Sequence, residues 1–153
     1  EFWNNEWWVK TESYGFRVTL GIGKPAGPND LHFILNAENP GQKEVWKAIN
    51  NDIKVPIGKW FTMEYYFKEG NHETGRFYMA ITPDGEPKKV VYDVNDFTHN
   101  TNDPNPNGLT GYNPMKLYTS KELVGFMKSE GKTLQIYWDD FKLWTNKKPE
   151  PSR

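Results

Sequence analysis

The stretch Gly58-Lys59-Trp60-Phe61-Thr62-Met63-Glu64-Tyr65-Tyr66-Phe67 decides the fold of this chain. From position 61 onward every second residue is large and apolar, which is the period of a β-strand that buries one face. The intervening positions carry Thr62, Glu64 and Tyr66. This stretch alone leaves open which set faces inward, because tyrosine occurs both in protein cores and on surfaces.

A second strand follows at residues 76–81, where apolar residues again occupy every second position. The connection at 68–75 is polar and ends in glycine, as is usual for a β-hairpin. We therefore expect an antiparallel pair with Phe77, Met79 and Ile81 in the core. The side chains between them then face outward.

The same alternation predicts another hairpin from residues 16–22 and 31–38, which are joined by a segment rich in Gly and Pro. Shorter strands are predicted at 89–94 and 115–118. Residues 134–144 give the last predicted strand. Its apolar positions change parity after Trp138, which indicates a β-bulge at Asp139-Asp140.

One segment has clear helix signals. Ser120 is a good N-cap for a helix over residues 121–129, and Gly131 is suited to end it. Residues 95–114 are rich in Asn and Pro, which predicts a long surface loop. Seven or more short strands with one short helix predict an all-β fold, a two-sheet antiparallel β-sandwich (jelly roll). We expect a single domain over residues 3–145, followed by a tail or linker at 146–153.

Composition narrows the classes of partner. The chain has 153 residues, 25% of them charged, and a formal net charge of -1, so a nucleic-acid partner is not expected. It has no apolar run of the ~20 residues that a membrane span needs. With no cysteine, disulfides and thiol nucleophiles are excluded. Aromatic residues make up 16% of a chain whose mean hydropathy is only -0.85, so some of them are expected to face solvent.

Three stretches resemble the concanavalin A-like jelly-roll domains: residues 58–67, Gly75-Arg76-Phe77-Tyr78-Met79-Ala80-Ile81, and Tyr137-Trp138-Asp139-Asp140-Phe141-Lys142-Leu143-Trp144. The resemblance covers about residues 10–145. Such domains occur in bacterial polysaccharide-degrading systems as carbohydrate-binding modules, and as the catalytic sandwich of some glycosidases and polysaccharide lyases. The resemblance implies a polysaccharide or oligosaccharide ligand, an extracellular or cell-surface location, and a monomeric module tethered to a larger protein.

Two departures from the family weaken the catalytic alternative. Laminarinase-like glycosidases carry a Glu-x-Asp-x-x-Glu motif, and a similar motif is absent here. The paired carboxylates used for glycoside hydrolysis are therefore missing. Of the motifs of alginate-lyase-like enzymes, only Met115-Lys116-Leu117-Tyr118 is similar, and His32 lacks the expected glutamine. We therefore expect a non-catalytic binding module. The alternatives are a small polysaccharide lyase or glycoside hydrolase using Tyr118, His32 or Glu64, and a protein-interaction sandwich that uses its sheet edges.

The outward parity of the predicted strands nominates a binding trough. Sugar rings present apolar faces with hydroxyl rims, so a site for them combines aromatic rings with planar polar groups. The nominated trough residues are Asn36, Glu64, Tyr66, Arg76, Tyr78 and Tyr118, with Arg17, Glu38, Thr62 and Lys116 on the same parity. The alternative is a solvated sheet face with cross-strand pairs, such as Glu64 with Arg76.

The tryptophans divide into two predicted groups. Trp46 lies in the polar segment 41–55 and is our candidate for a loop-borne stacking residue. Of the adjacent pair Trp7 and Trp8, one is expected to be exposed, and Trp8 is the candidate. Trp60, Trp138 and Trp144 lie in apolar strand patterns and are expected in the core.

A structural calcium ion is the one cofactor the sequence suggests. Asp139 and Asp140, with Asp93 or Glu6 as partners, offer the oxygen ligands that Ca²⁺ prefers. The alternative is a bulge with solvated carboxylates. The three histidines show no paired spacing, so a transition-metal site is not expected.

Overall fold

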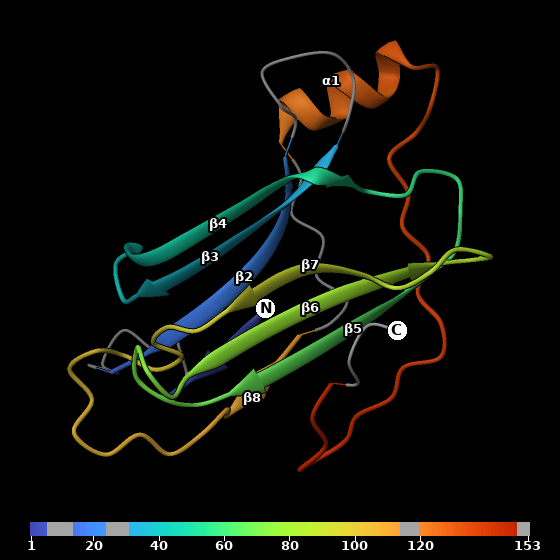
Figure 1. Cartoon of the computed structure of the whole chain (residues 1–153). Coiled ribbons are helices and arrows are strands. Elements are labelled where there is room, and N and C mark those ends of the chain that lie inside the picture. Colours follow the sequence, from blue (N-terminus) through green and yellow to red (C-terminus); the bar gives the residue numbers. More distant parts are fainter. Residues whose placement is uncertain (6–13, 24–30, 114–119, 150–153) are drawn as a thin grey trace.

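The computed structural model describes residues 1–5, 14–23, 31–113 and 120–149, and it confirms an all-β sandwich of two antiparallel sheets with one short helix (Figure 1). The larger sheet has the strand order β4-β3-β2-β1-β8 and the smaller one the order β5-β6-β7. The strands of the larger sheet are β1 (Phe2–Asn4), β2 (Phe16–Gly23), β3 (His32–Asn39), β4 (Lys43–Lys54) and β8 (Gly111–Tyr112). Those of the smaller sheet are β5 (Phe61–Lys68), β6 (Arg76–Pro83) and β7 (Lys89–Val94).

The core fills the space between the two sheets, and the predicted inward parity is confirmed. In β6, Phe77, Met79 and Ile81 are at most 1% exposed, while Phe16 in β2 and Phe33 in β3 come from the opposite sheet. Side chains of this size bury enough apolar surface to dominate the folding free energy. The hairpin of β5 and β6 is in register from Phe61 with Pro83 to Lys68 with Arg76.

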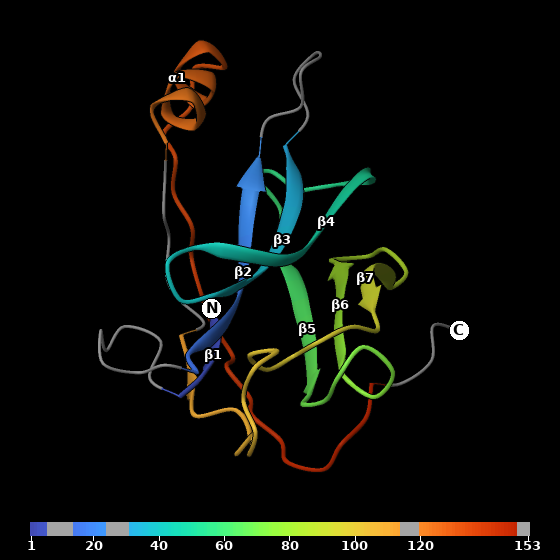
Figure 2. The same ribbon diagram turned by 90° about the vertical axis from the view of Figure 1, so that its left-hand side faces the viewer.

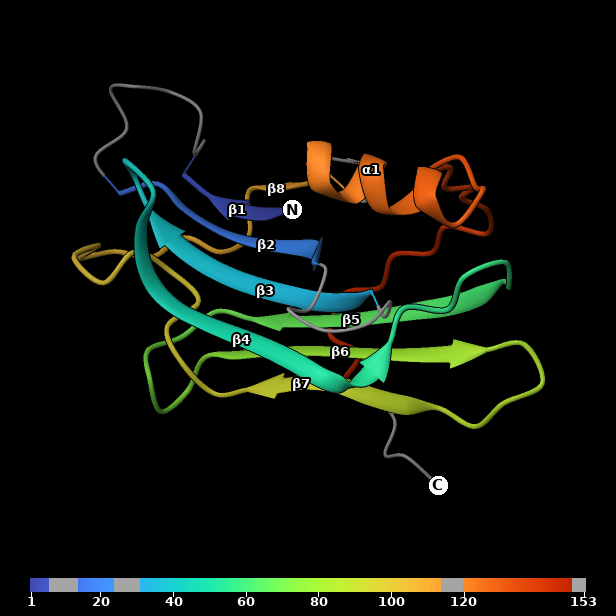
Figure 3. The ribbon, with the colours of Figure 1, turned by 90° about the horizontal axis from the view of Figure 1, so that it is seen from above.

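Strand β4 corrects the sequence prediction, because segment 41–55 is mostly a twelve-residue strand and not a polar loop. It pairs with β3 through two register shifts and curves from the larger sheet toward β7 (Figure 3). Asn50 joins the two sheets there: its Nδ2 donates to the backbone oxygen of Val91 at 2.8 Å, and its backbone N–H donates to Tyr92 Oη at 3.2 Å.

Helix α1 (Lys121–Ser129) is confirmed, including its cap: Ser120 Oγ accepts from the backbone N–H of Leu123 at 3.2 Å. Leu123, Phe126 and Met127 are its buried residues, and they pack with Leu31 next to β3. The helix therefore lies at one end of the larger sheet (Figure 2). No helix in the described residues is long and apolar enough to cross a bilayer.

Buried polar side chains anchor the predicted long loop after β7 to the rest of the sandwich. Thr98 is fully buried and its Oγ1 donates to the backbone oxygen of Lys68 at 2.7 Å, while Asn100 Nδ2 donates to that of Gly15 at 3.0 Å. Gly75 has to be glycine, because a Cβ there would lie 2.2 Å from the backbone oxygen of Asp96. Buried hydrogen bonds thus replace apolar packing in this loop.

The other correction concerns residues 134–144, which form no strand. After α1 the chain runs back along the sandwich as an extended segment toward β8 (Figure 1). The predicted strand at 115–118 lies outside the described residues.

Candidate binding face on the smaller sheet

The predicted trough residues do not form one surface. Glu64, Tyr66, Arg76 and Tyr78 lie on the outer face of the smaller sheet, because they alternate with the core residues of β5 and β6. Asn36 lies on the outer face of the larger sheet, together with Arg17 and Glu38. The core separates these two faces, so a single trough containing both sets is wrong. Trp8, Tyr118 and Lys116 lie outside the described residues.

The centre of the smaller sheet's outer face is a row across three strands. Tyr66 on β5 is directly opposite Tyr78 on β6, which in turn is opposite Asp93 on β7. Arg76 binds Asp93 with two parallel hydrogen bonds, Nε to Oδ1 at 2.7 Å and Nη2 to Oδ2 at 2.8 Å. Its guanidinium carbon lies 5.8 Å from the ring centroid of Tyr66 and 5.7 Å from that of Tyr78. This geometry fixes the guanidinium against both rings.

A second ion pair joins the same face. Glu64 Oε2 accepts from Lys88 Nζ at 3.0 Å, so Glu64 pairs with Lys88 and not with Arg76, the partner that a cross-strand pair predicts. Two ion pairs thus lie on this face: Arg76 with Asp93, and Lys88 with Glu64. We call these four residues with Tyr66 and Tyr78 the tyrosine face.

Tyr78 is the unusual member of the tyrosine face. Although it points away from the core, it is only 4% exposed, and its Oη is buried without a hydrogen-bond partner among the described residues. Burial, which disfavours the phenolate, raises its pKa, and the nearby charges of Lys88 and Glu64 act in opposite directions. An unpaired buried hydroxyl costs about 1–3 kcal/mol, so such a group is an exception in folded proteins.

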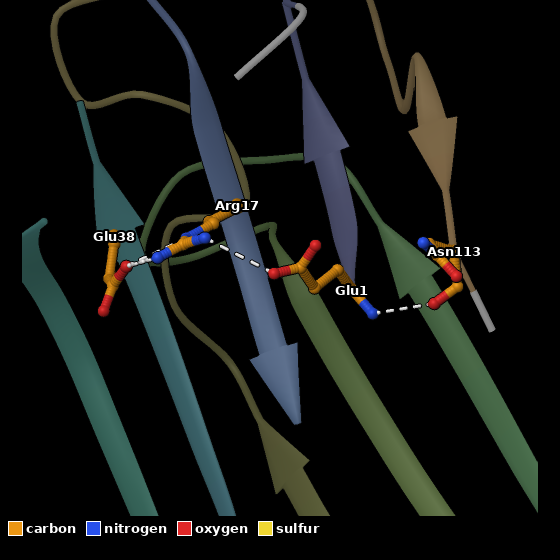
Figure 4. Close-up of polar contacts among 4 residues, drawn as sticks. All are labelled: Glu1, Arg17, Glu38 and Asn113. Atoms are coloured by element: carbon orange, nitrogen blue, oxygen red, sulfur yellow. Dashed lines mark hydrogen bonds and ion pairs between the residues drawn. The ribbon is translucent and has the colours of Figure 1, made fainter. Parts of the chain in front are cut away.

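The outer face of the larger sheet is bound together by a polar chain (Figure 4). Arg17 donates through Nε to Glu38 Oε2 at 2.9 Å and through Nη1 to Glu1 Oε1 at 3.3 Å. The amino group of Glu1 donates to the backbone oxygen of Asn113 at 3.0 Å. These contacts connect the residue before β1, strands β2 and β3, and the residue after β8, so they account for Arg17 and Glu38 structurally. Beside them, Asn36 has a buried Oδ1 with no partner in the described structure.

The tryptophan predictions are reversed. Trp46 is a core residue of β4, 8% exposed, and its Nε1 donates to the backbone oxygen of Phe97 at 2.7 Å, so it is no exposed stacking residue. Trp60, Trp138 and Trp144, predicted as core, are 55%, 42% and 60% exposed. Nothing in the sequence around Trp46 predicts its hydrogen bond to the loop at Phe97.

Asp139 and Asp140 are exposed, and the Asp140 backbone N–H donates to Asp139 Oδ1 at 2.8 Å. Asp140 has φ 53°, a left-handed conformation at the position of the predicted bulge. Of the proposed partners, Asp93 is bound to Arg76, and Glu6 lies outside the described residues. The described residues contain no group of three His, Asp or Glu side chains suited to a metal ion. Calcium binding stays a prediction, and a melting curve with EDTA and then with added Ca²⁺ tests it.

Of the residues nominated for catalysis, the two that the structure describes, His32 and Glu64, do not meet. His32 lies on β3 of the larger sheet, is 8% exposed, and has a buried Nδ1 without a partner among the described residues. Glu64 lies on the outer face of the smaller sheet. Acid and base catalysis on one substrate needs both groups within reach of it, and these two belong to opposite sheets.

Comparisons with known proteins return no match from family models, from curated proteins or from solved structures.

Proposed function

We propose that this chain is a non-catalytic carbohydrate-binding module that binds a neutral polysaccharide on the tyrosine face. The resemblance of residues 58–67 and 75–81 to concanavalin A-like modules supports a glycan as the ligand class. In this proposal the module is extracellular or displayed at a cell surface, and it tethers a larger glycan-degrading enzyme or surface protein to its substrate.

The observation that carries the proposal is the unpartnered, buried Oη of Tyr78 between two ion pairs. A hydroxyl in that position can donate to one ligand oxygen and accept from another. The carboxylates of Glu64 and Asp93 accept further hydroxyl protons, and Arg76 and Lys88 donate. Movement of one long charged side chain gives a sugar hydroxyl access to Tyr78.

The charge balance of the tyrosine face supports a neutral glycan. Arg76 and Lys88 are each already bound to a carboxylate at 3.0 Å or less, so a uronate group would have to compete with Asp93 or Glu64 for either of them. Sugar hydroxyl groups form hydrogen bonds with paired ions without breaking the ion pairs. Affinity then rests on hydrogen bonds and ring contacts, which are screened little by salt.

The test is a panel of neutral and acidic polysaccharides in affinity gels, with reducing ends and the absorbance of unsaturated products followed in parallel. We expect retardation by at least one neutral glycan, no product, and little change at about 0.5 M salt. Tyr66→Ala should weaken binding roughly tenfold, by analogy with the loss of one stacked ring. Thr19→Ala, on the opposite outer face, is the matched control. Product formation, or equal effects of both substitutions, contradicts the proposal.

A further inference from the structure

Segment 136–144 carries an unusual amount of exposed apolar surface. No strand pairs with it in the described structure. Exposed large apolar residues in one stretch of chain indicate a docking surface. The exposed fractions are 37% for Ile136, 70% for Tyr137, 42% for Trp138, 58% for Phe141, 73% for Leu143 and 60% for Trp144.

One flank of the sandwich is correspondingly not covered by any described residues. The inward residues of β5, among them Met63, Tyr65 and Phe67, are only partly buried, whereas those of β6 are buried completely. On the same flank, β8 pairs only with β1 among the described residues, and Tyr112 is half-buried. The flank between β8 and β5 thus has an open strand edge and half-buried aromatic rings.

The segment already touches this flank at one point. Tyr112 stacks on Phe2 at 4.6 Å between ring centroids, and Phe141 stacks on Tyr112 at 5.8 Å, with interplanar angles of 27° and 26°. At the other end, Leu134 packs against the cluster under α1. The segment therefore runs from α1 toward β8. In chain order β8 comes before α1, so β8 and the segment point in opposite directions. This is the antiparallel orientation.

We propose that segment 136–144 of this chain closes onto the open flank, with the residues around Phe141 pairing antiparallel with the two residues of β8 and the rest of the segment covering the half-buried rings of β5. The parity of the segment fits this closure. Because Phe141 faces Tyr112 and the chain turns at Asp140, Ile136 and Trp138 face the core, as does Leu143. Tyr137 and Trp144 then face solvent. This inference does not depend on the glycan proposal.

Hydrogen exchange on the full chain tests the closure first. The closed segment should show amides in 136–144 that exchange at least roughly tenfold more slowly than those of the C-terminal residues 146–149, because pairing protects them. Exchange at the rate of an unstructured chain throughout 136–144 overturns the proposal.

Two neighbouring substitutions supply a matched comparison. Trp138→Ala should lower the Tm by several degrees and speed exchange in the segment, while Tyr137→Ala should change neither, although Tyr137 is the more exposed in the open arrangement. Equal, small effects of both substitutions contradict closure. Should Trp138→Ala not fold, Ile136→Val gives a milder version of the same test.

Light scattering over a range of protein concentrations checks whether the segment that covers the flank comes from the same chain or from a second copy. A monomer with a protected segment supports closure within one chain. Protection that appears only together with a dimer overturns the proposal, because a second copy then supplies the segment.

Discussion

Arg76 and Asp93 form a two-pronged ion pair across β6 and β7, with both hydrogen bonds shorter than 2.9 Å, and this pair holds the guanidinium beside Tyr66 and Tyr78. Lysine cannot reproduce the fork. We therefore expect Arg76→Lys to weaken neutral-glycan binding several-fold in affinity gels. The free energy of unfolding should change by less than about 1 kcal/mol, because the pair is partly exposed.

Arg17→Lys is the matched control for Arg76→Lys, since it makes the same change on the opposite outer face, where Arg17 holds Glu38. It should leave glycan binding unchanged. If Arg17→Lys weakens binding as much as Arg76→Lys, the ligand is not bound on the tyrosine face.

Tyr78→Phe separates stability from binding. Removing a buried hydroxyl that has no partner should leave the free energy of unfolding unchanged or raise it by about 1 kcal/mol, because its desolvation cost disappears. Glycan affinity should fall, because the proposed contact is lost. Urea unfolding and affinity gels measure the two quantities.

Tyr92→Phe is the control for that comparison. Tyr92 Oη accepts from the backbone of Asn50 at 3.2 Å and donates to the backbone oxygen of Phe33, so its removal should cost about 1–2 kcal/mol of stability without changing glycan affinity. A loss of stability in Tyr78→Phe as large as in Tyr92→Phe would show that Oη of Tyr78 has a partner in the folded chain.

The strands and their inward faces could be predicted from local alternation, because burial of one face repeats every second residue. Alternation does not say to which sheet a strand belongs. For that reason the shared outward parity of Asn36 and Glu64 predicts one trough, although the two residues lie on opposite faces. Sheet membership depends on pairing between strands distant in sequence, such as β1 with β8.

Trp46 shows a second limit. The segment around it is polar because half or more of the residues of β4 are exposed, among them Glu44 and Lys47, and its register with β3 shifts twice. Such irregular pairing removes the simple period from the sequence. The tyrosine face, in contrast, was largely predicted: Glu64, Tyr66, Arg76 and Tyr78 lie on one face, and only Lys88 and Asp93 were missed as members of it.

The reversal of the tryptophans is tested by Trp46→Phe and Trp60→Phe. Trp46→Phe removes the donor to the Phe97 backbone oxygen and leaves a small void, so we expect a loss of about 1–3 kcal/mol in the free energy of unfolding. Trp60→Phe is a surface change and should stay within about 0.5 kcal/mol. If urea unfolding shows a larger loss of stability for Trp60→Phe than for Trp46→Phe, Trp60 is a core residue.

Tyr112 gives the fold a predictable sensitivity to alkali. Burial raises its pKa to about 12, and burial together with the nearby Tyr112 raises that of Tyr65. In the unfolded chain a tyrosine titrates near pH ~10. Between these values the unfolded state has released the proton and the folded state still holds it, so each rise in pH favours unfolding. The contribution of Tyr112 is therefore complete below pH ~10 and is lost as pH rises toward about 12.

Tyr112→Phe isolates this effect, because lysine deprotonation and the other tyrosines are common to both proteins. Urea unfolding from pH ~8 to ~11.5 should give parallel curves below pH ~10, above which the original chain loses stability faster than Tyr112→Phe. The substitution keeps the ring that stacks between Phe2 and Phe141, so packing is preserved. Curves that stay parallel up to pH ~11.5 would mean that Tyr112 titrates equally in both states and is not buried in the flank between β8 and β5.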